Sequence, residues 1–287
     1  MSSTLIKDNK VMSLGVLKYK AFTSSIRHLV NLEKAVLLKN NSIFKVLSGY
    51  NSCSGRSSLT GHITAWHRGS GNKRLYREIS YKNTNRFSLV VGVTYDPYRS
   101  SLVSINFDLK LKKFFNMISM LNFSPGTLVK ELREDQYLNK NKLDYFSKGN
   151  QMSLGFRSFL YRIPIGSVIN SITVGNKITY TKAAGTKAQL IRADLDSATV
   201  KLSTGKLVKV SGKSTASVGV VSNEKHRLLV YGKAGRKRNL GRRPIVRGVA
   251  MNPVDHPHGG RTSGGRSSVS PWGILTKSKF KLRKKKL

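Results

Sequence analysis

The sequence has few acidic residues, a single cysteine and no long apolar run. Asp and Glu number 13 against 52 Lys and Arg, which gives a formal net charge of +39 over 287 residues. Because Cys53 is the only cysteine, the chain can form neither an internal disulfide framework nor a cysteine-based zinc site. No stretch of about 18 uncharged apolar residues is present, so a transmembrane helix is not expected.

The excess of positive charge indicates a polyanionic partner. Charge of this size repels itself in an isolated protein, whereas each phosphate that the protein neutralises releases a counterion and favours binding. An anionic membrane surface is the alternative partner, but membrane binding typically uses a basic amphipathic helix or a local cluster. Here Lys and Arg are spread along the whole chain, which favours nucleic acid and predicts no membrane partner.

The first region with short strands predicts a small β-barrel. Strands are expected at residues 87–95 and 101–107, and residues 61–77 read as a short strand, a basic glycine-rich turn and another strand. An OB-fold fits this pattern, and OB-folds bind nucleic acid through basic loops and aromatic platforms. Three aromatic side chains are candidates for base stacking, with packing of most of them in the core as the favoured alternative: Trp66, Tyr76 and Tyr81.

A second region, residues 151–230, predicts another small barrel of SH3-like size. Short strands separated by tight turns are expected at residues 166–174, 188–193, 197–202 and 206–210. Its Gly-Lys-Ser-Thr sequence, residues 212–215, resembles the end of a phosphate-binding loop. However, Leu207 occupies the position of the required earlier glycine, and no strand–helix–strand pattern surrounds it, so nucleotide binding is excluded.

Two segments carry no motif, the first at residues 1–54 and the second at about residues 109–150. Residues 1–54 are an N-terminal extension in which residues 28–38 are expected to form an amphipathic helix. Residues 55–150 form the predicted OB-fold domain, and an insertion or linker with some helix is expected at about residues 109–150. The predicted class is therefore mainly β, an OB-fold barrel followed by an SH3-like barrel, with extended basic terminal segments.

Residues 231–287 are predicted to be a basic tail that orders only on a polyanion, because the segment has too little apolar content to fold alone. It contains the most distinctive stretch of the chain, residues 247–261. Pro253 and Pro257 fix the backbone there, and glycines at 259 and 260 permit close approach, which predicts a shaped loop that carries Asp255, His256 and His258.

The sequence of this loop is Arg-Gly-Val-Ala-Met-Asn-Pro-Val-Asp-His-Pro-His-Gly-Gly, and it resembles the signature of the universal large-subunit ribosomal protein number two family. Further motifs follow the family's order: Gly-His-Ile-Thr at 61–64, His-Arg-Gly at 67–69, Lys-Arg-Leu-Tyr-Arg at 73–77, Tyr-Asp-Pro-Tyr-Arg-Ser at 95–100, Ile-Pro-Ile-Gly at 163–166, Ala-Gly-Thr-Lys-Ala-Gln-Leu at 184–190, Gly-Lys-Ala-Gly-Arg-Lys-Arg at 232–238 and Ser-Pro-Trp-Gly at 270–273.

The resemblance implies an OB-fold, an SH3-like barrel and a tail buried in RNA. It implies a structural protein of the large ribosomal subunit that binds large-subunit rRNA, supports subunit association and sends its loop toward the peptidyl transferase centre. The implied partners are rRNA, neighbouring ribosomal proteins and the small subunit, with no cofactor and Mg²⁺ only as an rRNA counterion. The expected RNA contacts are Arg68, Lys73, Arg74, Arg77, Lys233, Arg236, Lys237, Arg238, Arg242, Arg243, Arg247, Asn252, His256, His258 and Arg261.

The chain also departs from the family pattern. The family's loop continues Gly-Gly-Gly-Glu-Gly-Arg, whereas here residues 259–266 read Gly-Gly-Arg-Thr-Ser-Gly-Gly-Arg, so the acidic residue is missing. Loose agreement and many Lys, Asn, Ser and Phe indicate an organellar ribosome, mitochondrial in our interpretation, with a bacterial or plastid one as the alternative.

Three other functions are open to this loop or to the charge. His256 is a candidate general acid or base in peptide-bond formation, because the pKa of histidine suits that role, but a histidine in an RNA wall more often donates hydrogen bonds or stacks. A metal site at His256 and His258 has only Asp255 as a further nearby ligand. A non-ribosomal RNA chaperone fits the charge but not the ordered series of motifs. We therefore expect no enzymatic activity.

Overall fold

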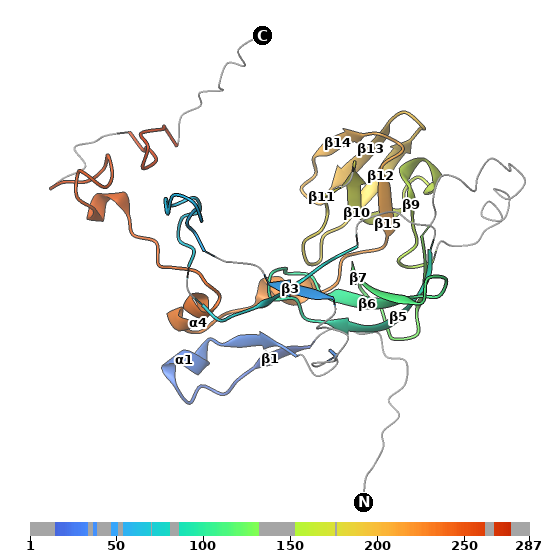
Figure 1. The fold of residues 1–287 in the computed structure, drawn as a ribbon, viewed down its shortest axis with the longest axis horizontal. Helices are drawn as coiled ribbons and strands as arrows, with labels where there is room; N and C mark the ends of the chain where they lie inside the picture. Colours follow the sequence, from blue (N-terminus) through green and yellow to red (C-terminus); the bar gives the residue numbers. More distant parts are fainter. Residues whose placement is uncertain are drawn as a thin grey trace, which may run out of the picture. The chain divides into compact units, whose positions relative to one another are not determined.

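The computed structural model describes residues 15–33, 37–38, 47–50, 54–69, 71–80, 86–131, 153–175, 177–261 and 267–276. The chain is mainly β (Figure 1), which confirms the predicted class. By the contacts within the chain it divides into two compact units, which are described separately. Unit 1 comprises residues 1–52 and 73–234, and unit 2 comprises residues 53–72 and 235–287.

The first β region of unit 1 is a four-stranded antiparallel arrangement in the order β8-β5-β6-β7. Its strands are β5 (Arg86–Thr94), β6 (Val103–Asp108), β7 (Lys113–Ile118) and β8 (Leu128–Glu131). β5 and β6 lie where alternation predicts them. By contrast, the insertion or linker expected at about residues 109–150 is wrong for its first part, because β7 and β8 are integral strands of the sheet; residues 132–150 lie outside the described residues.

The second β region contains seven strands: β9 (Arg157–Phe159), β10 (Val168–Val174), β11 (Lys177–Tyr180), β12 (Ala188–Ala193), β13 (Ala198–Leu202), β14 (Leu207–Val210) and β15 (Thr215–Val218). Buried and exposed residues alternate in β12, where Ala188 and Leu190 are buried and Gln189 and Ile191 are exposed. This alternation is the signal that located β12 in the sequence. Residues 212–215, the segment that resembles a phosphate-binding loop, form a turn and the start of β15.

One continuous sheet of eleven strands joins the two regions. The connection is a short parallel pairing in which Glu131 of β8 lies opposite Arg157 of β9. Arg157 is 2% exposed, and its Nη2 donates a hydrogen bond of 2.8 Å to Oγ1 of Thr173 in β10. Within the described strands neither region closes into a barrel. The OB-like and SH3-like regions are instead open parts of one sheet, which are hydrogen-bonded to each other between β8 and β9.

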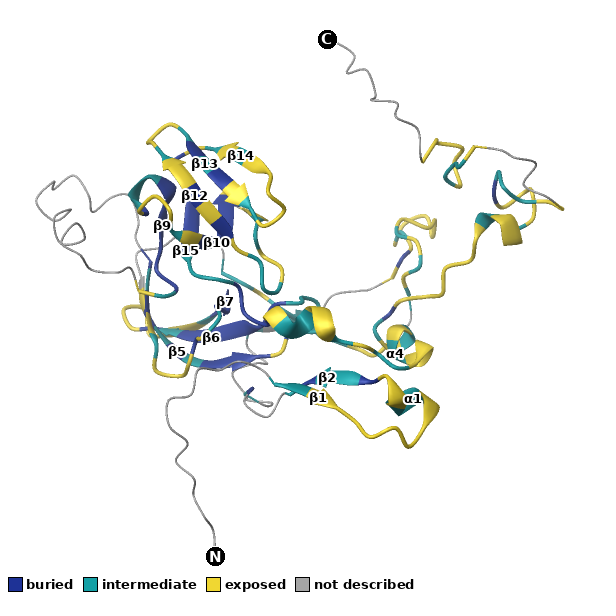
Figure 2. Ribbon diagram, turned by 180° about the vertical axis from the view of Figure 1, so that it is seen from behind, coloured by how far each residue is buried: buried dark blue, intermediate teal, exposed yellow. Residues whose placement is uncertain are grey.

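Each region has its own apolar core. Val90, Met117, Phe123 and Val129 belong to the core over the first region. The core of the second region includes the fully buried Leu190 and other side chains from β10, β12 and β13. Figure 2 shows the buried residues in dark blue along these strands. Burial of this apolar surface is the main source of stability for such short strands.

Two further two-stranded antiparallel sheets belong to unit 1. β1 (Val16–Lys18) pairs with β2 (Val30–Leu32) around the short helix α1 (Ser24–Arg27), and β3 (Ser48–Tyr50) pairs with β4 (Leu75–Arg77). The helix expected over residues 28–38 is therefore wrong at its start. The backbone of Val30 also bonds with that of Val230, more distant in sequence, so tertiary pairing overrides the local helical pattern there.

Short helical turns complete the described chain: η3 (Leu160–Arg162), η4 (Glu224–Leu228), α4 (Ala234–Asn239) and η5 (Gly248–Ala250). None of the helices in the described part of the chain is long and apolar enough to cross a membrane.

Candidate nucleic-acid interface

Unit 2 is built by pairing two segments that lie far apart in the sequence. The N–H of Gly69 donates to the carbonyl of Gly241 at 3.1 Å, and the N–H of Asn72 donates to the carbonyl of Asn239 at 2.9 Å. The backbones approach so closely that a Cβ on Gly71 would lie 2.6 Å from the nitrogen of Gly241. Glycine is therefore required at residue 71, which also has a φ of +112°.

His67 fixes the same pairing one step further along. Its carbonyl accepts a hydrogen bond of 3.0 Å from the N–H of Arg243, and its Nδ1 lies 3.1 Å from the carbonyl oxygen of Pro244. A carbonyl can only accept, so this contact places the ring proton on Nδ1. The Gly-His-Ile-Thr and His-Arg-Gly motifs thus belong to one structure with the basic tail.

The pairing sets two arginines against each other. Arg68 and Arg242 are directly opposite in an antiparallel bridge, and both are exposed. Like charges at opposite positions of paired strands are destabilising. Asp255 is the single acidic residue in the sequence of unit 2, so this unit has almost no carboxylate with which to balance its cations. Binding of an external polyanion would relieve this repulsion.

The other predicted contacts of unit 2 extend this basic surface. α4 carries three consecutive cations, of which Lys237 is exposed and Arg236 and Arg238 are half-buried. Further along, the side chains of Arg243, Arg247 and Arg261 are exposed. Forked guanidinium donors of this kind match phosphate oxygens.

Two exposed tryptophans of unit 2 lie edge to face. The rings of Trp66 and Trp272 have centroids 5.7 Å apart at an interplanar angle of 83°, and their side chains are 42% and 67% exposed. Trp66 is therefore not one of the core residues that the sequence predicts among the three candidate aromatics, and Tyr81 lies outside the described residues. Exposed aromatic faces are the usual stacking partners of unpaired bases.

Internal hydrogen bonds shape the loop at residues 252–260. The carbonyl of Asn252 accepts from the N–H groups of Asp255 (3.0 Å) and His256 (3.3 Å), while the N–H of Gly260 donates to the carbonyl of Met251 (3.3 Å). A Cβ at Gly259 would overlap the carbonyl group of Asn252, so glycine is required there. The loop that the two prolines predict is present and closes on itself.

The two loop histidines contact each other and the following segment. The ring of His256 is 8% exposed, its Nδ1 accepts a 3.0 Å hydrogen bond from the N–H of His258, and the two rings have centroids 4.7 Å apart. Nε2 of His258 lies 3.1 Å from both the carbonyl oxygen of Ser267 and the N–H of Val269. A single ring nitrogen serves one of these partners at a time, according to its tautomer.

This geometry bears on the catalytic and metal alternatives. Among the described contacts no hydrogen bond joins the carboxylate of Asp255 to His256, and Nδ1 of His256 is engaged by the backbone. The described residues also contain no group of three or more His, Cys, Asp or Glu side chains that is placed to hold a metal. The arrangement is that of a packed loop with one ring edge of each histidine committed to structure.

Comparison with known proteins agrees with this architecture. The family model for the RNA-binding N-terminal domain of ribosomal proteins L2 matches residues 44–130, and the model for their C-terminal domain matches residues 148–273. The large ribosomal subunit protein uL2 of Orientia tsutsugamushi is 40% identical over 276 residues, which is 93% of this chain and 94% of the relative. The chain belongs to the ribosomal protein L2 family.

Other relatives give the same result. The protein uL2m of Reclinomonas americana is 38% identical over 94% of each chain, and the uL2 protein of Rickettsia typhi is 35% identical over 95% of this chain and 96% of its own. The N-terminal family match runs from β3 to β8, and the C-terminal match runs from β9 through the histidine loop.

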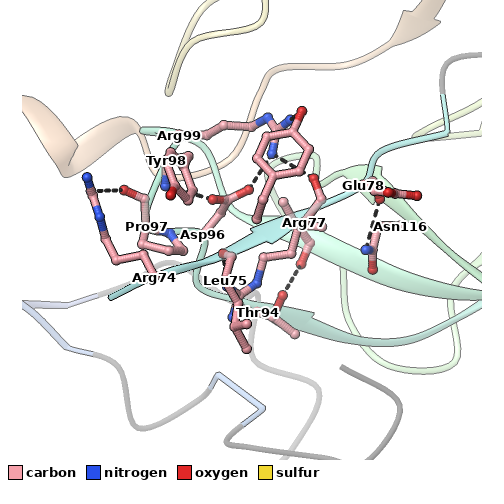
Figure 3. Close-up of polar contacts among 12 residues, drawn as sticks. Arg74, Leu75, Arg77, Glu78, Thr94, Asp96, Pro97, Tyr98, Arg99 and Asn116 are labelled. Atoms are coloured by element: carbon pink, nitrogen blue, oxygen red, sulfur yellow. Dashed lines mark hydrogen bonds and ion pairs between the residues drawn. The ribbon is translucent and has the colours of Figure 1, made fainter. Parts of the chain in front are cut away.

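Within unit 1, the side chains of two predicted RNA contacts, Arg74 and Arg77, bond to carbonyl groups of the protein itself (Figure 3). Nη1 of Arg74 donates to the carbonyl of Pro97 at 3.0 Å, and its guanidinium lies 4.8 Å from the ring centroid of Tyr98. Nη1 of Arg77 donates to the carbonyl of Leu75 at 2.8 Å. These contacts give both arginines a structural role, whereas Lys73 and Lys233 are exposed.

Sequence reasoning missed Arg99, which organises this part of unit 1. Its Nη1 pairs with Oδ2 of the fully buried Asp96 at 2.6 Å, and its Nη2 donates to the hydroxyl of Tyr76 at 3.0 Å. Oδ1 of Asp96 also accepts from the N–H of Tyr98 at 2.8 Å, which is the turn that the Asp-Pro-Tyr-Arg sequence predicts. Tyr76 is half-buried in this network, as the core interpretation expects.

Proposed function

We propose that this chain is a structural protein of the large ribosomal subunit that binds large-subunit rRNA mainly through unit 2. The observation that carries the proposal is the bridge between Arg68 and Arg242 in a unit with one acidic residue. Such a pairing is unfavourable alone and favourable against phosphates. Membership of the L2 family supports the same assignment.

The test of this proposal is binding of the full chain to purified large-subunit rRNA in competition with an equal mass of small-subunit rRNA. Preference for the large-subunit RNA is expected, because loops and grooves of a specific shape accept the paired arginines and the exposed tryptophans. Equal affinity for both RNAs would instead favour the chaperone function that the charge alone permits.

We further propose that the loop at residues 252–260 scaffolds the peptidyl transferase centre without taking part in the chemistry. The family resemblance supports its location, and the contacts of His256 support its passive role. Its Nδ1 is engaged by the backbone, and its ring is almost completely buried. A general acid or base must reach the proton that it moves, which this placement of the ring disfavours.

Replacing His256 with glutamine distinguishes a scaffolding role of the loop from a catalytic role. Intact subunits that carry the variant are expected to form peptide bonds within a few-fold of the wild-type rate. General acid–base catalysis contributes about 10² to 10⁴-fold, so a loss of about a hundredfold in correctly assembled subunits would assign the chemistry to His256.

The remaining parts of the proposal concern partners and compartment. Support of subunit association, contacts with neighbouring ribosomal proteins and Mg²⁺ only as an rRNA counterion follow from the family resemblance. A mitochondrial ribosome is proposed from the composition and from the similarity to the uL2m protein, while the uL2 relatives in bacteria leave a bacterial ribosome as the alternative.

A further inference from the structure

One side of the four strands β5 to β8 in unit 1 carries a row of apolar side chains that are exposed or half-buried. Leu89 of β5 is opposite Leu128 of β8 and opposite Phe107 of β6, and Phe107 is in turn opposite Phe114 of β7. Opposite residues of paired strands share a face, so these side chains form one row across four strands. Phe87 and Leu109 extend the row, joined by a backbone hydrogen bond of 3.0 Å. We name this set of six residues the outer apolar face.

The alternation of the strands separates the outer apolar face from the core. Ser88, Asp108 and Val129 lie at the intervening positions, share the opposite face and are buried. Leu128 is 59% exposed, and the rings of Phe107 and Phe114 have centroids 5.0 Å apart. Phe87, Leu109 and Phe114 are exposed as well, while Leu89 and Phe107 between them are half-buried. A contiguous apolar face that is largely exposed, on a chain as charged as this one, marks an interaction surface.

The border of the outer apolar face is cationic. The turn between β6 and β7 carries Lys110 and Lys112, and β7 begins at Lys113; all three are exposed. The Nζ of Lys130 lies 4.9 Å from the ring centroid of Phe87. The acidic residues of the same strands, Asp108 in β6 and Glu131 in β8, are buried. Oδ1 of Asp108 accepts hydrogen bonds from two backbone N–H groups of the turn. The surface therefore presents an apolar centre with positive charge at its rim.

We propose that the outer apolar face binds a neighbouring protein of the large subunit, through an apolar segment of that protein bordered by Asp or Glu. The inference rests on the proposed place of the chain in that subunit. A second copy of this chain would set the same lysines against each other, which is unfavourable. RNA phosphates would satisfy the lysines but would leave the leucine side chains without an apolar partner.

The first test introduces a negative charge at the centre of the face. Large subunits are purified with the full-length chain as wild type, as Leu128→Glu and as Leu207→Glu. Leu207 of β14 is 57% exposed, so it provides a matched control with the same side chain, exposure and charge change. Quantitative mass spectrometry is expected to find one subunit protein reduced at least tenfold in the Leu128→Glu particles, and not in the wild-type or Leu207→Glu particles. Leu109→Glu, in the turn after β6, is expected to reduce the same protein.

The second test identifies the contact directly. A photo-reactive benzoylphenylalanine at position 114 is expected to cross-link the protein that the Leu128→Glu particles lose, within a peptide that combines apolar residues with Asp or Glu. A cross-link to rRNA or to this chain's own residues would overturn the proposal, as would an unchanged protein composition in the Leu128→Glu subunits. Failure of the variant chain itself to enter subunits would also overturn it, because the face would then serve rRNA binding or the fold.

The proposed function fails in a different way. If the proposed function is wrong, the wild-type chain is absent from large subunits and shows no preference for large-subunit rRNA, whatever the outer apolar face binds.

Discussion

Replacing Arg242 and Arg243 with glutamine removes two exposed cations from the paired segments of unit 2. Each cation that neutralises a phosphate contributes a slope of about −0.7 to −0.9 to the logarithm of affinity against the logarithm of salt concentration. The double variant is therefore expected to flatten the slope for large-subunit rRNA by about 1.4 to 1.8.

The same slope fixes how the defect depends on salt. Between about 50 mM and about 200 mM salt, two phosphate contacts account for about a tenfold change in affinity. The loss of affinity that the double variant shows relative to wild type is thus expected to be large at about 50 mM salt and about tenfold smaller at about 200 mM salt. Filter binding or fluorescence anisotropy of the full chain over this range measures both quantities.

A matched control is Arg192→Gln in unit 1. Nε of Arg192 lies 2.7 Å from Oδ2 of Asp194, so this charge is already balanced within the protein. Its removal is expected to change the salt slope much less, for each charge removed, than the removal of Arg242 and Arg243. A slope that is unchanged in the Arg242 and Arg243 double variant, or flattened equally by Arg192→Gln, would refute the reasoning that unit 2 supplies the phosphate contacts.

Three further predictions concern the fold and the loop. Leu190→Ala removes a fully buried side chain and is expected to cost about 2–5 kcal/mol of unfolding free energy in a denaturant titration. Gly248→Ala places a Cβ 2.5 Å from Nδ1 of His256 and is expected to raise the reactivity of that ring with diethylpyrocarbonate several-fold, whereas Gly235→Ala meets no atom within 4 Å and is expected to leave it unchanged. Burial lowers the pKa of His226, so the folded state binds its proton less readily than the unfolded state. The stability that neutral His226 contributes is present above about pH 6.5 and lost as the pH falls below that value, and His226→Gln is expected to reduce this loss in thermal melts.

The outcomes that would contradict these predictions are equally specific. Ile191→Ala, next to Leu190 but exposed, is expected to cost less than Leu190→Ala, and an equal cost would place the core elsewhere. Equal reactivity of His256 in the Gly248 and Gly235 variants would show that the ring does not pack on residue 248. An identical acid sensitivity of wild type and His226→Gln would assign that sensitivity to other groups.

Strands with clear alternation could be located from the sequence. β5, β6 and β12 to β14 lie within two residues of their predicted positions. In β12 the alternation has its usual physical cause, because one face of the strand meets the core and the other meets solvent. β7 was missed since its residues, Lys-Phe-Phe-Asn-Met-Ile, do not alternate in polarity although its last three are buried. The strand at Val30 was missed because it depends on pairing with β1 and with Val230, which no local pattern reveals.

The candidate interface was predictable in composition but not in geometry. The basic residues and the loop with its histidines are evident in the sequence. The pairing that sets Arg68 against Arg242 is not, because the two residues lie far apart in the sequence and meet in an isolated bridge. Of the two strands expected within residues 61–77, the second is present as β4, whereas the first is wrong, because residues 61–69 form turns and single bridges. The inward turn of Arg74 and Arg77 likewise depends on carbonyl groups whose positions only the folded chain defines. Charge therefore indicated the partner, while the structure distinguishes the arginines that face solvent from those that support the fold.

Sedimentation tests the central claim most directly. A tagged full-length chain from fractionated cells is run through a high-salt gradient, and the RNA that co-sediments is sequenced. Migration with the large subunit and its rRNA is the predicted result, because the proposed function has unit 2 held by many phosphate contacts. The origin of that RNA identifies the compartment. A chain that runs free, or that carries a mixture of unrelated RNAs, would contradict the account.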